Sequence, residues 1–442
     1  MSEPQEPTPR ILDPFRQFFA LQQDVLVLSL AMFAFSLGFQ MTNRFLPEYL
    51  EHLGATEFII GLFVSLGAII GAIYPYYGGV ISDRIGSRFA LTVFGLLSTL
   101  GFVVWLFADF IGTVTIGILE IEPWIWVFVG LFFAQCWKSF GIGGHYAIVK
   151  QSIDPARLAR GFASTETFRR SAFLVAPLIV AVLVANEFMP GFLWVLAIGI
   201  VFGILGTAAQ HFLYQVEEDS VGKSFQGFGQ ILDDIQALPG PLRPLLISDI
   251  FIRFANGMVY AFFILVITSV MEIGLTIPVP GWQQIELSPA GFFGVLIAVE
   301  MLIALVTMAP TAKLAEYTGL KPVVGLGFTV YAIFPVMLIF APSDQLVLIV
   351  LFAFSGLRFA GLPAHKALIV GPAEAGAGGR VTGSYYFMRG LLIIPAGTLG
   401  GALYQFVSPE AAFTTATVIG LVGVGYFALF GQDFEPYTRS AV

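Results

Sequence analysis

Long uninterrupted runs of apolar residues dominate the chain. Twelve of them approach or exceed the ~20 residues that a helix needs to cross a ~30 Å hydrocarbon core. They lie at roughly 25–46, 57–79, 89–110, 124–149, 161–185, 190–214, 243–268, 289–310, 322–341, 344–369, 380–406 and 411–431. Because the runs are continuously apolar, and do not alternate over ~10 residues, they predict membrane-spanning helices and not the strands of a barrel.

Composition supports a protein whose solvent is mostly lipid. Of the 442 residues, 57% are hydrophobic and 11% are charged, whereas soluble proteins carry about 25% charge. We therefore expect an all-α integral membrane protein. The single Cys136 excludes an intramolecular disulfide and a cysteine metal cluster, and the four histidines are scattered. We expect no cofactor, no bound metal and no nucleic-acid partner.

The distribution of charge predicts the orientation in the membrane. The first 24 residues are polar and acidic, unlike a cleaved signal peptide. With the N-terminus inside, most of the 21 Lys and Arg residues fall in cytoplasmic segments, and Arg44, at the end of the first span, is the base left outside. We expect a plasma-membrane protein with both termini cytoplasmic, and a monomer. The excess of Asp and Glu (29) over Lys and Arg (21) is consistent with a halophilic prokaryotic source; the alternative is an acidic surface unrelated to salt.

The chain divides into two related halves. We expect a cytoplasmic segment (1–24), a first bundle (25–215), a cytoplasmic linker (216–242), a second bundle (243–431) and a cytoplasmic tail (432–442). The halves align at an offset of 220 residues, which becomes 233 over the second and eighth spans. The first offset pairs Lys138 with Arg358, His145 with His365, Arg160 with Arg380, Arg169 with Arg389 and Gly54 with Gly274. The second pairs Gly61 with Gly294, Asp83 with Glu316, Gly86 with Gly319 and Arg88 with Lys321.

Small residues spaced four apart indicate where helices cross closely in lipid. Examples in the predicted spans are Gly67 with Gly71, Gly199 with Gly203 and Gly397 with Gly401. The alternative is that these are ordinary glycines of membrane helices.

A short polar loop carries a family resemblance. The residues Gly79, Asp83, Arg84, Gly86 and Arg88 resemble the signature loop between helices two and three of the major facilitator superfamily. Glu316 and Gly319 belong to a degenerate second copy. The resemblance implies twelve transmembrane helices in two pseudo-symmetric six-helix bundles, which rock about a central site for a small-molecule substrate and a coupling ion, proton or sodium.

The same resemblance gives the loop a role. Asp83 would bind the N-terminal end of helix eleven as a gate latch, with Arg84 and Arg88 bracing it; the alternative is a positively charged loop with a tight turn at Gly86. Segment 380–401 is similar to helix eleven of drug-exporter-type members. The fifth span has only Ala176-Pro177 in place of the exporters' glycine-flanked Gly-Pro, which weakens the case for antiport.

Six basic residues fall inside the predicted spans, about 9 to 11 residues from the inner helix ends. At 1.5 Å per residue this is a depth of ~13–16 Å, close to the membrane midplane. A mid-span base costs roughly 2.5–3.5 kcal/mol on insertion scales, so these bases should face a wet cavity. They are Lys138, Arg169, Arg170, Arg253, Arg358 and Arg389. Their surplus charge favours an anionic or carboxylate-bearing substrate; the alternative is structural bracing.

Glu300 is the acid that the sequence places at the same depth. We expect it to pair with Arg169 or Arg170 and to couple transport to protons when the pair opens, or else to form a permanent bridge between the bundles. Glu166 lies one helical turn before these arginines, and its carboxylate could accept a hydrogen bond from one of them. His145 and His365 lie near helix C-termini, where capping is favoured over proton carriage.

These patterns favour one function and leave two alternatives. The first is a secondary active transporter that moves a small anionic solute by alternating access. The alternatives are proton-coupled efflux of drugs or amphiphilic metabolites, and a membrane solute sensor, which would need a partner for its output. The sequence has no nucleotide-binding loop, metal-ligand pair or nucleophile with a base, so we do not expect an enzyme.

Overall fold

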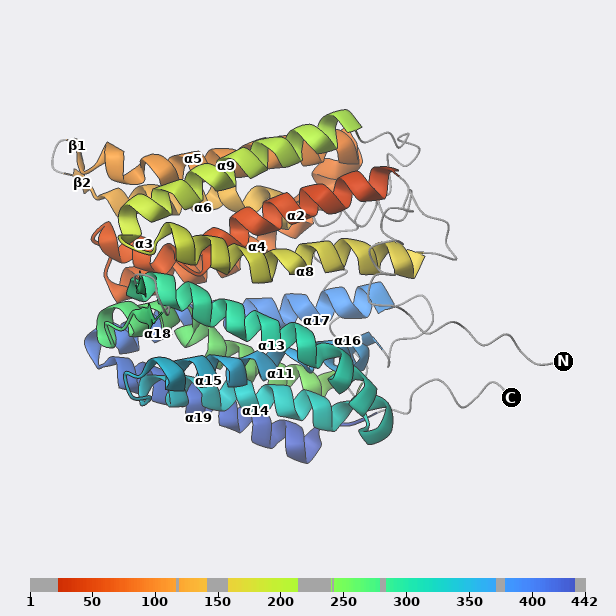
Figure 1. Ribbon diagram of the computed structural model, residues 1–442. Coiled ribbons are helices and arrows are strands. Elements are labelled where there is room, and N and C mark those ends of the chain that lie inside the picture. Colours follow the sequence, from red (N-terminus) through yellow and green to blue (C-terminus); the bar gives the residue numbers. More distant parts are fainter. Residues whose placement is uncertain are drawn as a thin grey trace.

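The protein is an assembly of long, roughly parallel helices. The computed structural model describes residues 23–116, 119–140, 158–213, 240, 242–278, 284–370 and 378–433. Helices from the first half of the chain, red to yellow-green in Figure 1, pack beside those from the second half, green to blue. This helical, membrane-spanning fold class agrees with the prediction from the apolar runs.

The first half is built from the following elements: α2 (Gln23–Asn43), α3 (Leu46–His52), α4 (Glu57–Ile85), α5 (Ser87–Ile111), β1 (Val114–Ile116), β2 (Leu119–Ile121), α6 (Pro123–Gln135), the π-helical turn η1 (Cys136–Phe140), α8 (Leu158–Leu183) and α9 (Phe188–Leu213). Within this half α2 packs against α8 and α9, and α5 packs against α6 and α9.

The second half is built from α11 (Leu242–Val259), η3 (Tyr260–Phe262), α12 (Phe263–Leu265), η4 (Val266–Val270), β3 (Leu275–Ile277), β4 (Ile285–Leu287), α13 (Pro289–Thr318), α14 (Leu320–Ile339), α15 (Gln345–Gly356), η5 (Leu357–Phe359), α16 (Leu362–Val370), α17 (Gly378–Ile393), α18 (Ala396–Phe406) and α19 (Pro409–Phe430). Here α19 packs against α11 and α14, and α13 packs against α15.

All twelve predicted spans overlap these helices. In the part of the chain that the structure describes, nine helical segments are long and apolar enough to cross a membrane. They cover the second, third, sixth and all later predicted spans. The first predicted span overlaps α2, the fourth overlaps α6 and η1, and the fifth overlaps α8. That these three segments cross the membrane stays a prediction.

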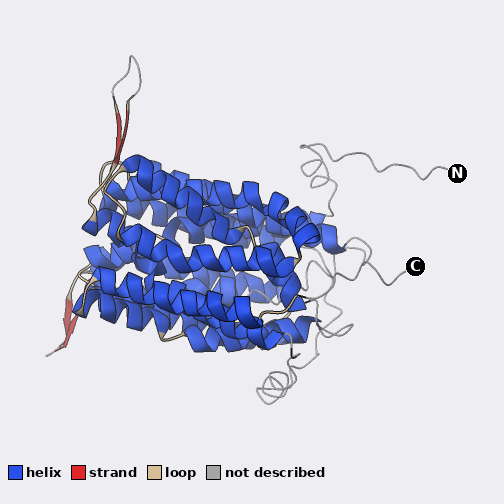
Figure 2. Cartoon of the chain, turned by 90° about the horizontal axis from the view of Figure 1, so that it is seen from below, coloured by secondary structure: helices blue, strands red, loops and turns tan. Residues whose placement is uncertain are grey.

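The expectation of an all-helical chain misses two short antiparallel hairpins. Thr115 pairs with Glu120 in the first, and Thr276 pairs with Glu286 in the second. Both hairpins lie at the same end of the molecule, clear of the helices (Figure 2). We call this end the hairpin end. The second hairpin lies between Gly274 and Gly294, where the offset between the halves changes from 220 to 233, and residues 279–283 lie outside the described part.

Local sequence explains where several helices begin and end. Ser288 and Ser408 each accept a hydrogen bond from a backbone N–H three residues on, and each is followed by proline, which suits the first helical position. Gly86 ends α4 with φ 84° and Gly319 ends α13 with φ 89°, a conformation that favours glycine. These two glycines are partners in the predicted repeat, so both halves make the same turn.

The two halves meet closely toward the hairpin end. Helix α4 packs on α18, and α8 packs on α13. A Cβ added to Gly397 would lie 2.7 Å from the carbonyl oxygen of Gly61, so this crossing depends on glycine. The predicted pair Gly397 with Gly401 is therefore a true close crossing, as is Gly199 with Gly203 within the first half. The prediction is wrong for Gly67 and Gly71, where a Cβ would meet nothing within 4 Å.

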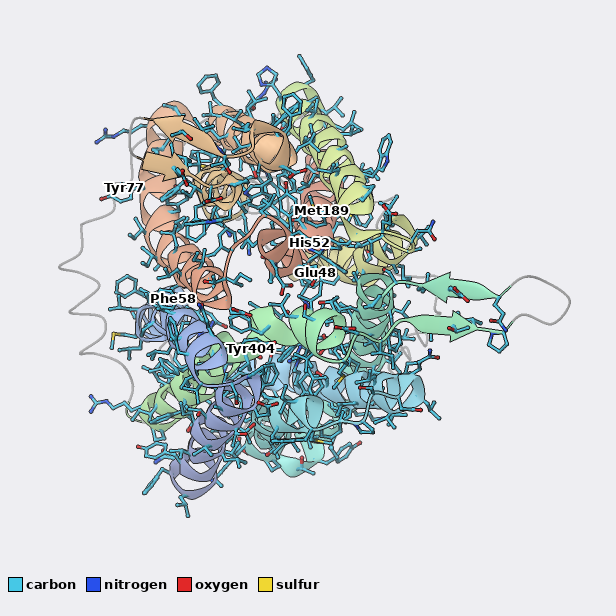
Figure 3. All side chains as sticks on the ribbon, turned by 90° about the vertical axis from the view of Figure 1, so that its left-hand side faces the viewer. Glu48, His52, Phe58, Tyr77, Met189 and Tyr404 are labelled. Carbon is cyan, nitrogen blue, oxygen red and sulfur yellow. The ribbon has the colours of Figure 1, made fainter. Side chains whose placement is uncertain are left out.

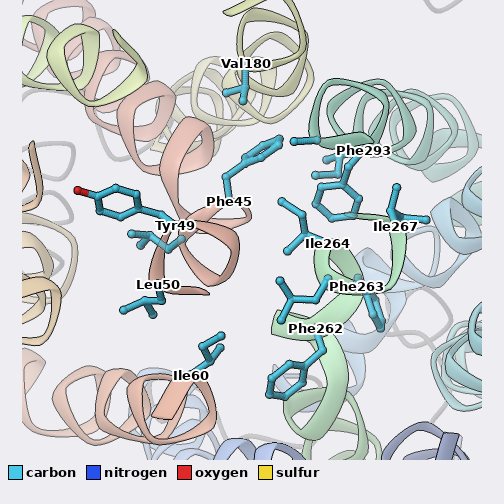
Figure 4. Packing of buried hydrophobic residues seen from close by; sticks show 14 of the residues in the cluster. Phe45, Tyr49, Leu50, Ile60, Val180, Phe262, Phe263, Ile264, Ile267 and Phe293 are labelled. Carbon is cyan, nitrogen blue, oxygen red and sulfur yellow. The ribbon is translucent and has the colours of Figure 1, made fainter. Parts of the chain in front are cut away.

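A layer of buried apolar side chains fills the interface between the halves (Figure 4). Phe45 meets Phe293 edge to face, with ring centroids 5.7 Å apart. Phe45 is 0% exposed and Phe293 1%. The hairpin end is therefore closed to water along this line.

Candidate functional site

A buried ion-pair cluster joins the two halves of the chain. Glu300, from the middle of α13, is 0% exposed. Its Oε2 accepts a hydrogen bond from Arg44 Nη2 at 2.6 Å, and its Oε1 accepts from Arg358 Nη2 at 2.6 Å. Ser355 Oγ donates to the same Oε1 at 2.5 Å. Arg44 belongs to the turn after α2, so a charged contact crosses from one bundle to the other.

Aromatic rings surround the two arginines. The Arg44 guanidinium lies 4.1 Å from the ring centroid of Tyr260, and that of Arg358 lies 5.6 Å from the same ring. Arg358 also faces the rings of Phe359 and Tyr331, at 4.8 and 5.2 Å. Ring faces attract cations, so these aromatics stabilise positive charge that Glu300 alone does not neutralise.

The cluster carries surplus positive charge and spare donors. Two guanidinium groups share one carboxylate. Among the residues that the structure describes, Arg44 Nη1 and Arg358 Nε are buried and have no hydrogen-bond partner. An unpaired buried donor is costly, so both N–H groups have the capacity to donate to a further anionic or carbonyl oxygen.

A cavity of about 240 Å³ opens beside Arg44. Its wall follows α13 from Ile297 to Met308, away from the hairpin end, and both halves of the chain contribute to it. Polar groups come from Gln40 and Asn43 in α2, and from Arg44 and Tyr260. The rest of the lining is mostly apolar. The cavity thus combines a small polar end at the ion pair with a larger apolar body.

A second charged cluster lies within the second half. Asp249 in α11 is 0% exposed. Its carboxylate accepts hydrogen bonds from Arg253 Nε at 3.2 Å, Arg389 Nη1 at 2.9 Å and the Tyr385 hydroxyl at 3.1 Å. His365 Nε2 lies 3.4 Å from the same carboxylate. Arg253 donates onward to the Tyr331 hydroxyl at 3.0 Å, and the Tyr331 ring faces Arg358. One aromatic residue therefore touches both clusters.

Several expectations about these charges are wrong. Glu300 is bound by Arg44 and Arg358, whereas the side chains of its predicted partners Arg169 and Arg170 lie outside the described residues, so that pairing stays a prediction. Arg44 is 6% exposed and lies in the interface, although charge counting placed it outside. The reason is that the chain turns inward after α2 before α3 begins. Glu300 is also not the lone buried acid, because Asp249 neutralises part of the charge of Arg253 and Arg389.

The sequence predicts that His365 caps a helix end, but its imidazole instead lies against the Asp249 carboxylate. It is 3% exposed, in α16, and faces Asp249. Lys138 lies in η1 with an exposed side chain, its Nζ 6.0 Å from the ring centroid of Phe39. The side chains of Glu166, Arg169 and Arg170 in α8 lie outside the described part of the chain, and so does His145.

The signature loop is described in part. Gly79 and Asp83 belong to α4 and Glu316 to α13, with side chains outside the described part. Arg84 is exposed. Arg88 Nε donates to the backbone carbonyl of His211 at 2.7 Å, near the end of α9; because the side chain of Asp83 lies outside the described residues, the bracing role of Arg88 stays a prediction.

Sequence reasoning missed Arg44, Tyr260, Ser355 and Asp249. Asp249 had a usable signal, since an acid four residues before a base pairs with it on one helix face, as Asp249 does with Arg253. No comparable signal in the sequence marks Arg44, because its burial depends on how the second half packs against it.

Comparison with known proteins agrees with the helical arrangement. A sequence profile described as the Major Facilitator Superfamily matches residues 2–121 and 28–299. None of the curated protein sequences compared with the chain matches it significantly.

Solved structures resemble the whole chain in fold. A POT family transporter in complex with 5-aminolevulinic acid is 12% identical with a TM-score of 0.70, over 94% of this chain and 100% of that one. The nucleoside transporter NupG is 12% identical with a TM-score of 0.68, over 93% and 98%. The human organic anion transporter MFSD10 (TETRAN) is 14% identical with a TM-score of 0.59, over 91% and 98%. At these identities the likeness concerns the fold.

Proposed function

Since this chain belongs to the Major Facilitator Superfamily, we propose that it is a secondary active transporter that moves a small anionic or carboxylate-bearing solute by alternating access. The observation that supports this substrate class is the surplus of buried positive charge at the interface between the halves. Arg44 and Arg358 share Glu300, each has a spare buried donor, and Arg44 lines a cavity. Arginine binds carboxylate and phosphate oxygens through its planar fork.

The same geometry provides a route to ion coupling. An anion that binds Arg44 or Arg358 competes with the Glu300 carboxylate for its donors. Once released from its arginine partners, the Glu300 carboxylate would be free to bind the coupling proton. Substrate binding and protonation would then reinforce each other, which makes a proton the favoured coupling ion over sodium. Because Arg44 and Glu300 come from different halves, their separation would also free the bundles to rock.

Efflux of amphiphiles is the second candidate, favoured by the cavity lining. Ile297, Met301, Leu305 and Met308 present an apolar surface along α13, and flexible methionines adapt to varied apolar ligands. A ligand with one anionic group and an apolar body would satisfy both ends of the cavity. The earlier likeness to drug-exporter-type members rests on segment 380–401 alone and gives no further support.

A ligand screen followed by transport tests the proposal. The purified protein is heated with acetate, lactate, succinate, glutamate or phosphate, and with glucose and tetraphenylphosphonium as neutral and cationic probes. We expect one of the anions to raise the melting temperature. Uptake of that anion into proteoliposomes should be saturable.

Variants then locate the site. Truncating one partner of a buried charge pair costs about 2–5 kcal/mol, so Arg44→Gln and Arg358→Gln should weaken the anion's apparent affinity by at least about 30-fold. Lys313→Gln removes one positive charge from an exposed position on α13 and should leave affinity unchanged. Glu300→Gln should transport without a pH gradient. Transport of glucose or tetraphenylphosphonium alone, unaffected by both arginine variants, would contradict the anion proposal.

The other predicted residues stay candidates within this proposal. Arg253 and Arg389 would act through Asp249, whereas Lys138, Arg169 and Arg170, with Glu166, would face the pathway from the first half.

For the signature loop we propose the latch role of Asp83. Asp83→Asn should leave membrane abundance unchanged but shift the accessibility of a cavity cysteine, and an unchanged accessibility would reduce Asp83 to a turn residue.

We further propose that the hairpin end faces outside the plasma membrane, with both termini cytoplasmic. The acids Asp109, Glu120, Glu272 and Glu286 belong to the helix ends and hairpins at that end, whereas Arg84, Arg88, Lys313 and Lys321 lie near the opposite helix ends. In this orientation residues 25–215 and 243–431 are the moving bundles, 216–242 joins them in the cytoplasm, and the protein works as a monomer. A cysteine at position 120, in a Cys136→Ala background, should be labelled only from outside.

A further inference from the structure

Helix α3, which follows the first predicted span, touches the end of the seventh predicted span at the hairpin end through a hydrogen bond between equivalent residues of the repeat. Thr268 Oγ1, in η4, donates to Glu48 Oε2, in α3, at 2.5 Å. The two residues are 220 positions apart, the same offset that relates the halves in sequence. Two residues related by a two-fold repeat can touch only near its axis. The contact therefore lies at the centre of the interface, where Glu48 and His52 are seen between the halves in Figure 3.

Neighbouring groups strengthen this contact and surround it with negative charge. Ser269 Oγ donates to Glu51 Oε2 at 3.1 Å, again across the interface. Glu51 lies on the same helix as Glu48, and α4 contributes Glu57, which acts on Glu51. His52 Nδ1 lies 3.8 Å from Glu48 Oε1, and the His52 ring packs at a tilt of 34° against Phe188 of α9, with centroids 5.0 Å apart. Glu272 follows η4 and lines the same cavity.

Glu48 is buried although it lies beside water. Its side chain is 7% exposed, next to the apolar layer around Phe45. On its other side a cavity of about 580 Å³ is lined by Glu48 together with Ser269, Glu272 and His52, which are exposed. Burial, and to a smaller extent the charge of Glu51, raise the pKa of Glu48 to about 7, against the opposing effects of Thr268 and His52. Helix α3 lies between the first two predicted spans, so the carboxyl group is outside the membrane-spanning segments.

We propose that Glu48 is a proton-binding site in the contact that closes the hairpin end, and that proton binding from that side holds the two bundles together there. A neutral carboxyl group still accepts the Thr268 hydrogen bond and avoids the cost of burying a charge. An ionised Glu48 is better solvated when the bundles part and water enters. The inference rests on the proposed alternating access but is independent of the substrate and of Glu300.

The sign of the pH effect follows from the raised pKa. When the bundles part, the carboxyl group returns toward its ordinary pKa of 4.5. The closed state is therefore favoured fully below about pH 4.5, and this advantage is lost as the pH rises to about 7. Within that window the ratio of closed to open molecules should fall by up to about tenfold per pH unit, because one proton is released. Acid outside would thus close the hairpin end.

Distance measurements across the hairpin end test the proposal. Spin labels are placed at Thr115→Cys in β1 and Thr276→Cys in β3, both exposed, in the full chain with Cys136→Ala in lipid nanodiscs. Between pH 4.5 and 8 the unmodified interface should show a growing population at longer distance. Glu48→Gln should keep the short distance throughout. Glu410→Gln, an exposed acid at the start of α19, should behave like the parent.

A second variant, Thr268→Val, tests the proposal independently in case Glu48→Gln does not fold. Thr268→Val removes the hydrogen bond that lowers the pKa of Glu48, so the opening should shift to higher pH by an amount that a purely structural role would not produce. A pH response that persists in Glu48→Gln, or one unmoved by Thr268→Val, would refute the role of Glu48 while leaving alternating access intact. A single distance at every pH in the parent would contradict both proposals.

Discussion

Arg88 and Lys321 make the same contact in the two halves of the chain. Arg88 Nε donates to the backbone carbonyl of His211 at 2.7 Å, and Lys321 Nζ donates to that of Ala428 at 3.0 Å. His211 lies near the end of α9, the last helix of the first half, and Ala428 near the end of α19, the last helix of the second. Each base thus fastens the start of one helix to the C-terminal end of another, where exposed carbonyls carry partial negative charge.

Removing either base should loosen its own half. A cation at a helix C-terminus contributes about 0.3–1 kcal/mol, and up to ~2 kcal/mol when partly buried. Arg88→Gln should therefore lower the melting temperature more than Lys321→Gln, because the Arg88 contact is partly buried and the Lys321 contact is exposed. Arg84→Gln, at an exposed position nearby, is the control. Thermal unfolding of the purified protein measures all three, and equal effects would argue against capping.

Sequence periodicity was enough for the helices and for the relation between the halves. Apolar runs depend only on the hydrocarbon thickness, so spans could be placed without knowing their neighbours. The repeat pairs Gly86–Gly319 and Arg88–Lys321 proved to share conformation and contact, because a turn and a cap are set by a few adjacent residues.

Partners of the buried charges could not be obtained in the same way. Depth along a span gives the level of a residue but not the direction of its side chain. Arg358 was correctly expected to be buried, yet its contact with Glu300 depends on how η5 faces α13, and Arg44 reaches Glu300 only because the halves close on each other. The two hairpins were missed because Leu275–Ile277 and Ile285–Leu287 are too short for a periodic signal.

The pair formed by Arg44 and Glu300 should show strong coupling. Breaking a buried pair from one side typically costs about 3–5 kcal/mol, because the other charge is left unpaired. Arg358 still holds Glu300 after Arg44→Gln, so that variant should be the milder one, and Glu300→Gln should destabilise more, since it leaves two arginines buried. The double variant should be more stable than the sum of the single effects predicts. Denaturation of the four proteins in detergent measures the coupling, and additive effects would show that the pair adds no stability.

Asp249 should be essential to the packing of the second half. It binds Arg253 of its own helix α11 and Arg389 and Tyr385 of α17, and it lies beside His365 of α16. Asp249→Asn keeps the size of the side chain but leaves two partly buried cations without a counter-charge, at a cost of up to about 3–5 kcal/mol. We expect a marked loss of folded protein in the membrane, partly restored by Arg389→Gln in the same chain. Fluorescence size-exclusion chromatography measures this; no restoration would mean that hydrogen bonding, and not charge balance, holds the cluster.

The closed hairpin end should depend on the absence of a side chain at Gly397. This glycine of α18 lies against Gly61 of α4, and an added Cβ would lie 2.7 Å from the Gly61 carbonyl oxygen and 2.8 Å from the side chain of Val64. Backbone atoms cannot give way at such a distance without separating the helices. Since α4 and α18 belong to different bundles, the clash in Gly397→Ala would act between the bundles and not within either one. We therefore expect normal folding but a shift toward the state in which the hairpin end is open.

Accessibility of a single cysteine distinguishes this shift from a general loss of stability. A cysteine in place of Ser65, which is 7% exposed and accepts hydrogen bonds from Thr398 across the same interface, should be protected from a membrane-impermeant maleimide in the parent with Cys136→Ala. In Gly397→Ala its labelling from the hairpin side should rise severalfold. Gly71→Ala adds the same methyl group on α4 where nothing lies within 4 Å, and should leave labelling unchanged. If Gly397→Ala remains protected and equally stable, the crossing tolerates a side chain and the bundles close by other contacts.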